Sequence, residues 1–273
     1  MLVRRKQALD METTMKLFRN LAAVAFFFLL GSSGCAQTLR VAAAADLQFA
    51  MNDLSSQYEK KTGAKVTISY GSSGNFRAQI ENGAPFDIFF SADAMYPQQL
   101  VTAGVADAKS LTVYAQGHLV LWAPKDENLR IADKGLEALK DSRIVKIAIA
   151  NPEHAPYGRA AVAALQNAGL YDQAKSKLVL GENISQAAQF VQTGNAQVGL
   201  IALSLTYAES MKGGDRWEIP SNLYPPILQS AVIIQASPNK AAANAFLDFV
   251  KSEEGRKVLA KYGFSAPPSP TNP

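Results

Sequence analysis

The chain has 273 residues, of which 48% are hydrophobic and 18% are charged. This composition is ordinary for a globular protein, excludes a wholly disordered chain, and can supply one large hydrophobic core or two smaller ones. The formal net charge of +4 comes mostly from residues 1–36, because the remainder carries 22 basic and 21 acidic side chains. The charge therefore gives no indication of nucleic-acid binding.

Residues 1–36 are predicted to be a signal peptide. A short basic region precedes the apolar run LAAVAFFFLL, which is too short to span a bilayer. Cleavage after Ala36 fits the small residues there, whereas cleavage before Cys35 would leave a cysteine that carries a lipid. We favour the first, because Ser32 stands where a lipoprotein signal normally has leucine. Cys35 is the only cysteine, so the exported chain has no disulfide.

After this leader, predicted strands and helices alternate. Residues 39–45 form a short apolar strand, and Asp46 follows it at the start of a helix. An alternating strand at 65–70 leads into Gly71-Ser72-Ser73-Gly74, where the next helix begins, and a third strand covers 86–90. Strand followed by helix, several times over, is typical of a mainly parallel sheet with helices on both faces.

A second series of strands and helices begins after the β-rich stretch 111–123, which ends at Pro124. We place the first crossing between lobes at this proline and the return crossing at the β stretch 227–235. The sequence thus predicts an α/β fold with two lobes. Lobe 1 is expected at 37–122 and 226–266, lobe 2 at 123–225, and a disordered, proline-rich tail at 267–273.

Four strand-to-helix junctions suit an anion: Ala45-Asp46, Ser72-Ser73-Gly74, Pro156-Tyr157-Gly158 and Asn183-Ile184-Ser185. Each offers free amides and the positive end of a helix dipole, and none places a lysine or arginine at the junction itself. In a two-lobed fold such junctions converge on the cleft. We therefore predict a small-oxyanion site built from neutral donors, with the Ser73 hydroxyl among them.

Other interpretations of these residues remain. Ser72 and Ser73 alone could be a turn and a helix cap. A serine hydrolase would need Gly-x-Ser-x-Gly, and the segment at 71–74 is one residue short of that motif. Neither His118 nor His154 is an evident catalytic partner, and two distant histidines do not indicate a metal site. We expect both histidines to be structural or exposed.

Four motifs resemble those of the periplasmic molybdate-binding proteins of ABC transporters: AAAADLQFAM (42–51), SYGSSGNF (69–76), ENGAPFDIFFSAD (81–93) and NPEHAPYGRAAVAAL (151–165). The resemblance runs from about Leu39 to Phe264. It implies a monomeric, two-lobed periplasmic binding protein of type II, without enzyme activity or cofactor, that takes molybdate and also tungstate to a membrane permease. Binding of another tetrahedral oxyanion, such as phosphate or sulfate, and a role in sensing instead of transport stay open.

By the same resemblance, the ligand contacts fall on Asp46, Ser73, Tyr157, Ile184 and Ala202. The better-known branch of the family has serine in place of Asp46 and tyrosine in place of Ala202. Asp46 could cap its own helix, could be partly protonated, or could accept a proton from a protonated oxyanion, and we favour the cap. Ser204 and the Tyr157 hydroxyl are candidates to replace the missing tyrosine.

Overall fold

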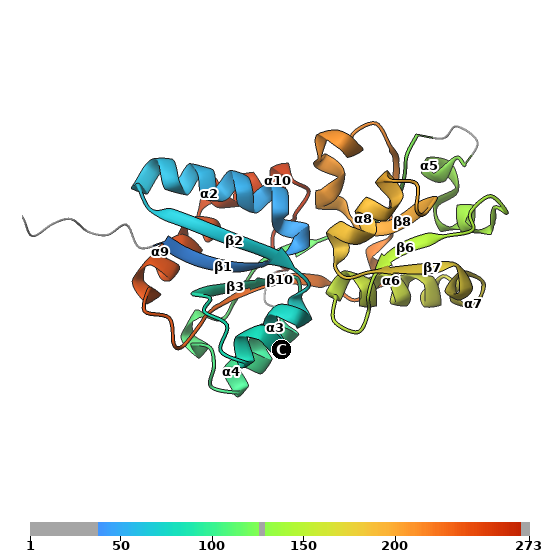
Figure 1. Ribbon diagram of the computed structural model, residues 1–273. Helices are drawn as coiled ribbons and strands as arrows, with labels where there is room; N and C mark the ends of the chain where they lie inside the picture. The colour runs from blue at the N-terminus through green and yellow to red at the C-terminus, as the bar shows by residue number, and fades with distance from the viewer. Residues whose placement is uncertain (1–37, 126–128, 269–273) are drawn as a thin grey trace, which may run out of the picture. The chain divides into compact units, whose positions relative to one another are not determined.

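The computed structural model describes residues 38–125 and 129–268. The predicted signal peptide with Cys35, and residues 269–273 of the predicted tail, lie outside this part of the chain. From Thr38 onward the chain forms one compact unit, with two five-stranded sheets that are each flanked by helices (Figure 1). The predicted α/β fold with two lobes is confirmed.

The sheet of lobe 1 has the strand order β2-β1-β3-β10-β4. Its strands are β1 (Thr38–Ala44), β2 (Lys65–Gly71), β3 (Ile88–Ser91), β4 (Thr112–Gly117) and β10 (Ile227–Ile233). Its helices are η1 (Ala45–Leu47), α2 (Gln48–Thr62), α3 (Ser73–Glu81), α4 (Met95–Thr102), η2 (Ala108–Ser110), α9 (Lys240–Lys251) and α10 (Glu253–Lys261).

The sheet of lobe 2 has the order β7-β6-β8-β5-β9. Its strands are β5 (Leu119–Ala123), β6 (Ile147–Ala150), β7 (Leu178–Gly181), β8 (Val198–Ala202) and β9 (Asp215–Glu218). The α-helices are α5 (Ile131–Lys134), α6 (Pro156–Asn167), α7 (Tyr171–Ala174) and α8 (Ile184–Gln192). The short helices are η3 (Gly135–Lys140), η4 (Lys175–Lys177), η5 (Leu203–Tyr207), η6 (Glu209–Met211) and η7 (Ser221–Leu223).

Both sheets follow the same plan, and both are mixed, not mainly parallel as the sequence suggested. In lobe 1, β1 pairs parallel with β2 and β3, whereas β10 pairs antiparallel with β3 and β4. In lobe 2, β6 pairs parallel with β7 and β8, whereas β5 pairs antiparallel with β8 and β9. The antiparallel strands β5 and β10 are the ones that follow the two crossings between lobes. The pairing is mixed because each sheet includes one strand that arrives from the other lobe and runs antiparallel to its neighbours. Hydrophobic periodicity does not show where the chain crosses between lobes.

The first crossing lies at His118, between β4 and β5, and not at Pro124 as expected. The run 111–123 is apolar on both sides of His118, so the sequence shows no boundary there. The space beside Gly117, the last residue of β4, is filled: a Cβ atom would stand 2.2 Å from the Tyr157 hydroxyl oxygen. Close approach of α6 therefore requires a glycine where the chain changes sheet.

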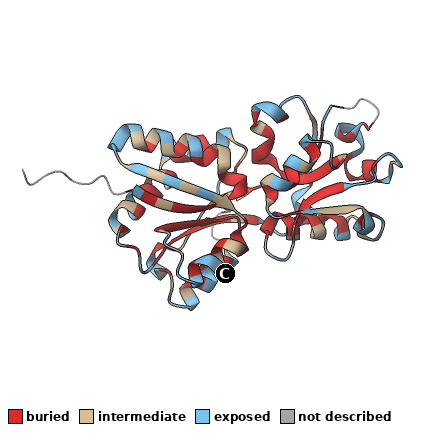
Figure 2. Cartoon of the chain, in the orientation of Figure 1, coloured by how far each residue is buried: buried red, intermediate tan, exposed pale blue. Residues whose placement is uncertain are grey.

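The core of lobe 1 is closed by the buried face of α9. Phe246 is fully buried and packs edge-on against Phe90 and Tyr58, with ring centroids 6.0 and 5.1 Å away. Ala243 and Val250 lie on the same face at helical spacing. Figure 2 shows the inner strands buried, the edge strand β2 partly exposed, and the outer faces of the helices exposed. Among the described residues, none of the helices has the length and apolarity that crossing a membrane requires.

We expect Phe246→Ala to lower the free energy of unfolding by about 3–5 kcal/mol, because the substitution removes buried contacts and leaves a cavity. Chemical denaturation measures this change. Leu180→Ala is the control, since Leu180 is 49% exposed and its loss should cost less than about 0.5 kcal/mol. Equal effects of the two substitutions would contradict this account of the core.

Candidate anion-binding site

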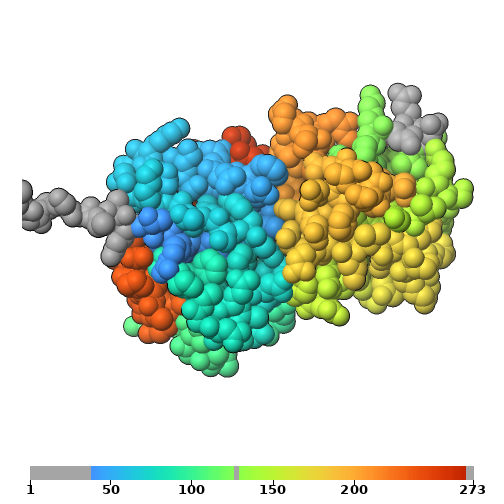
Figure 3. All heavy atoms as spheres, viewed as in Figure 1, coloured from blue at the N-terminus to red at the C-terminus, as the bar shows by residue number. Residues whose placement is uncertain are grey.

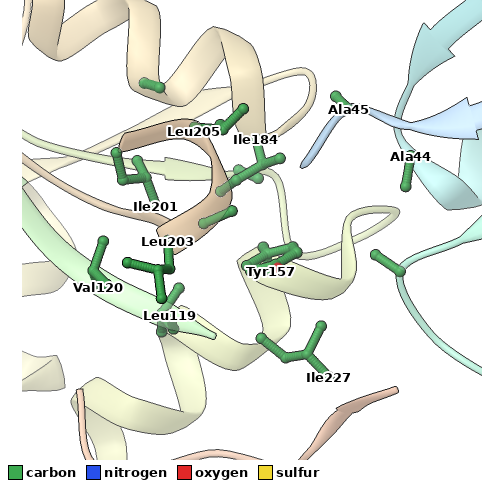
Figure 4. Close-up of a cluster of buried hydrophobic side chains, with 14 of the residues drawn as sticks. Ala44, Ala45, Leu119, Val120, Tyr157, Ile184, Ile201, Leu203, Leu205 and Ile227 are labelled. Carbon is green, nitrogen blue, oxygen red and sulfur yellow. The ribbon is translucent and has the colours of Figure 1, made fainter. Parts of the chain in front are cut away.

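A small cavity lies where the four predicted junctions meet. Its volume is about 10 Å³, and its walls are Ala44, Ala45, Asp46, Gly71, Ser72, Ser73, Ala92, Ala155, Pro156, Tyr157 and Ile184. Figure 4 shows Tyr157 and Ile184 at the starts of α6 and α8, with Ala44 and Ala45 at the end of β1. This volume suits about one water molecule, so a tetrahedral oxyanion requires the walls to move apart.

Three helices begin at the cavity wall, and each is arranged differently. Ser72 precedes α3 in an extended conformation, Pro156 occupies the first position of α6, and the Asn183 side chain accepts hydrogen bonds from Ser185 N and Gln186 N of α8. The first amides of a helix have no partner within it. The amides of Ser73, Tyr157 and Ile184 therefore stand in position to donate to an anion.

The Ser73 hydroxyl is oriented by the neighbouring strand. Its oxygen accepts a hydrogen bond from Ala92 N at 3.0 Å, and the residue is 1% exposed. Because this contact uses a lone pair, the hydroxyl proton remains available for a ligand. Ala92 was not among the residues predicted for the site, although it lies in a strand-to-helix junction, Ser91-Ala92-Asp93, of the same kind as the other four.

His154 joins the two lobes beside this wall and has a structural role, as expected, although the sequence did not indicate that it contacts a serine. Its Nδ1 lies 2.9 Å from Ser72 Oγ, and its carbonyl oxygen accepts a hydrogen bond from Gly74 N at 2.9 Å. Its Nε2 is 3.9 Å from the Glu182 carboxylate, which is too long for the base–acid hydrogen bond of a catalytic triad. The hydrogen bonds of His154 with Ser72 and Gly74 thus hold the two lobes together.

Further polar contacts hold the lobes together around the cavity. Arg159 of α6 pairs with the Asp93 carboxylate, and its Nη1 donates to the Tyr96 hydroxyl at 3.0 Å. Ser185 Oγ donates to the carbonyl oxygen of Ala45 at 3.1 Å. In Figure 3, α3 meets the segment after β7, where Asn75 donates to Glu182.

Asp46 does not cap its helix, so the favoured interpretation was wrong. Neither η1 nor α2 has a side-chain cap. The side chain is fully buried: Oδ2 accepts a hydrogen bond from Gln229 Nε2 at 2.6 Å, whereas Oδ1 has no partner. Burial raises the pKa of Asp46 to about 7, although Tyr157, Gln229 and the backbone amides of Asp46 and Leu47 act to lower it. Partial protonation at neutral pH is the interpretation that fits.

Tyr157 lines the cavity, and its hydroxyl lies beside the side chain of Asp46. The hydroxyl lies against Gly117, in a buried cluster with Asp46. The hydroxyls of Tyr157 and Tyr114 and the Oε1 of Gln229 have no hydrogen-bond partner. Burial, followed by the Asp46 charge, raises the pKa of Tyr157 well above its ordinary value.

Ala202 does not line the cavity, unlike the other four residues implied by the resemblance. It ends β8, is fully buried and pairs with Leu119. Ser204, the other candidate replacement, donates its hydroxyl proton to the Asp46 carbonyl oxygen at 2.7 Å. Within the part of the chain that the structure describes, no cluster of three His, Cys, Asp or Glu side chains could hold a metal ion.

Comparison with known proteins gives a consistent result. Residues 39–265 match the model of a family described as bacterial extracellular solute-binding protein. The molybdate-binding protein ModA of Azotobacter vinelandii is 44% identical over 237 residues, which cover 86% of this chain and 93% of the relative. ModA of Rhodobacter capsulatus is 40% identical over 242 residues, covering 89% and 94%. A solved Azotobacter vinelandii periplasmic molybdate-binding protein has a TM-score of 0.80 at 36% identity, covering 84% of this chain and 100% of that chain.

We expect Gly74→Ala to hinder docking of the lobes. A Cβ atom at this position would stand 2.7 Å from both the His154 carbonyl oxygen and the Tyr96 hydroxyl. Overpacking of this size typically costs about 1–3 kcal/mol, so binding of an oxyanion between the lobes should weaken about 5- to 150-fold. Small-angle scattering with a saturating oxyanion should show a larger radius of gyration than for the unaltered protein.

Gly213→Ala is the matched control, because nothing lies within 4 Å of a Cβ atom at Gly213. This variant should bind and scatter as the unaltered protein does. Unchanged affinity and scattering for the Gly74 variant would show that the contact with His154 does not limit docking.

Proposed function

Because the chain belongs to the bacterial extracellular solute-binding protein family, we propose that it captures molybdate, and also tungstate, between its lobes and delivers the anion to an ABC-transporter permease. One observation carries the proposal: helix starts from both lobes meet at a single cavity whose donors are uncharged. The names of the relatives from Azotobacter and Rhodobacter support molybdate as the anion.

Neutral donors can hold such a dianion. Each helix start favours an anion by about 0.3–1 kcal/mol, and by up to about 2 kcal/mol when it is partly buried. The amides of Ser73, Tyr157 and Ile184 and the Ser73 hydroxyl add hydrogen bonds from opposite sides. A cage of donors held by the fold suits one size of anion, because a smaller anion leaves buried donors unpaired. This supports discrimination of molybdate from sulfate.

Transport follows from the role of binding proteins in this family. The protein works as a monomer in the periplasm, without a cofactor, and nucleic acid has no part in its function. The cross-lobe contacts of His154 and Arg159 form only when the lobes are together. A permease can therefore distinguish loaded from empty protein by the relative position of the lobes.

Calorimetry of the chain without residues 1–36 tests the assignment. Titration with molybdate, tungstate, chromate, sulfate and phosphate should show tight binding of the first two and weak binding of the smaller anions. Tight binding of phosphate or sulfate without binding of molybdate would contradict the proposal and establish a different oxyanion.

We expect Ser73→Ala to weaken molybdate binding by about 1–3 kcal/mol, because a buried anion loses one donor. Calorimetry measures the affinity, and thermal unfolding of the empty variant reports separately the lost contact with Ala92 N. Ser69→Ala is the control, since Ser69 is exposed on the neighbouring strand β2. An affinity equal to that of the control would mean that the serine only shapes the turn.

A further inference from the structure

The carboxyl group of Asp46 is the part of the cavity that capture of an anion does not explain. Asp46 lines the same cavity as Ser73, Tyr157 and Ile184, and it is fully buried. Gln229 Nε2 donates a hydrogen bond to one carboxyl oxygen, Oδ2, at 2.6 Å, while the other oxygen, Oδ1, has no hydrogen-bond partner in the protein. Burying a polar atom without a hydrogen-bond partner costs free energy, so we expect Oδ1 to contact the anion in the occupied site.

The groups that face Asp46 do not neutralise it. Tyr157 approaches from α6, Tyr114 from β4 and Gln229 from β10, and Ser204 of η5 donates to the Asp46 carbonyl oxygen. All four side chains are uncharged, since burial keeps the pKa of both tyrosines high. The backbone amides of Asp46 and Leu47 also favour the ionised form of the carboxyl group, but less than burial disfavours it. An ionised carboxylate would therefore stand beside a dianion with repulsion between them and no cation to offset it.

We propose that Asp46 is a neutral carboxylic acid in the occupied site and donates its proton to the bound oxyanion, so that capture of a dianion takes up one proton. This inference rests on the proposed function. Oδ1 carries the proton towards the anion, and Oδ2 continues to accept from Gln229 Nε2. When Asp46 is ionised before binding, the proton comes from solvent, and no bond within the anion breaks.

The buried position of Asp46 prepares it for this role. With the lobes docked as in this structure, burial already raises the pKa of Asp46 to about 7, and a dianion next to it raises the pKa further. Below pH 7 the acid is already protonated, so affinity should not depend on pH. Above pH 7 each binding event must also take up a proton, so affinity should fall about tenfold per pH unit until the pKa of the occupied site is reached.

The same proton makes Asp46 a specificity-determining residue. Molybdate and tungstate as dianions offer only acceptors, which match a carboxylic acid donor. A monoprotonated anion such as hydrogen phosphate brings a donor of its own, so that two donors would face each other across the cavity. Selectivity for the fully deprotonated anion should therefore be greatest below pH 7.

Calorimetry of the unaltered protein tests the proton uptake directly. Molybdate is titrated at pH 8 in two buffers whose ionisation enthalpies differ, and the difference in binding enthalpy gives the number of protons taken up. We expect a value approaching one. Tight binding without proton uptake would overturn this inference and leave the proposed function intact, whereas absence of binding at both pH 6 and pH 8 would overturn both.

Asp46→Asn assigns the proton to this residue, because the amide donates as the acid does but cannot titrate. The variant should take up no proton, and its affinity should stay constant between pH 6 and pH 8.5, exceeding that of the unaltered protein at the upper end. Asp53→Asn is the matched control: Asp53 lies on α2 outside the cavity, where it pairs with Lys261 at 2.8 Å.

The control should keep the full pH dependence of the unaltered protein. If Asp46→Asn retains that dependence as well, the proton belongs to another group and the inference is wrong. Thermal unfolding checks that the variant is folded. If it is not, the uptake measured on the unaltered protein decides the inference, because that measurement needs no substitution.

Discussion

The convergence of four chain segments on one small cavity is the constraint on which the rest of this structure depends. Each segment leaves the carboxyl end of a strand and enters a helix, and two come from each lobe. Unpaired amides at these helix starts face a common space, which neither lobe could enclose alone. Binding and docking of the lobes are therefore parts of one event.

Apart from Asp46, the charged side chains near the site lie outside the cavity wall. The ion pair of Arg159 with Asp93 joins the lobes beside the cavity, and neither residue lines it. Within the cavity the donors are amides and a hydroxyl, and the one acid, Asp46, is held where burial favours its neutral form. An arginine in the wall would bind any anion strongly, whereas a set of neutral donors at fixed positions depends on the geometry of the anion.

Much of the site could be predicted because its residues are adjacent in sequence. Ser73, Tyr157 and Ile184 follow strand endings that composition reveals, and helix starts have predictable donors. The partners of these residues could not be found in the same way. His154 meets Ser72 across 82 positions of the chain, and Gln229 meets Asp46 across 183. Periodicity describes neighbours along the chain and contains no information on such pairs.

By itself, the sequence determined the alternation of strands and helices, the two lobes, and the anion-binding character of their junctions, because these depend on local spacing and on the chemistry of helix termini. Only the tertiary structure decided where the chain changes sheet, which partners Ser72 and Ser73 have, and whether Asp46 caps a helix. Each of these depends on burial and on contacts between distant segments. Asp46 shows the reason: as a helix cap it would be ionised, but the tertiary structure buries it away from water, and this burial favours the protonated form.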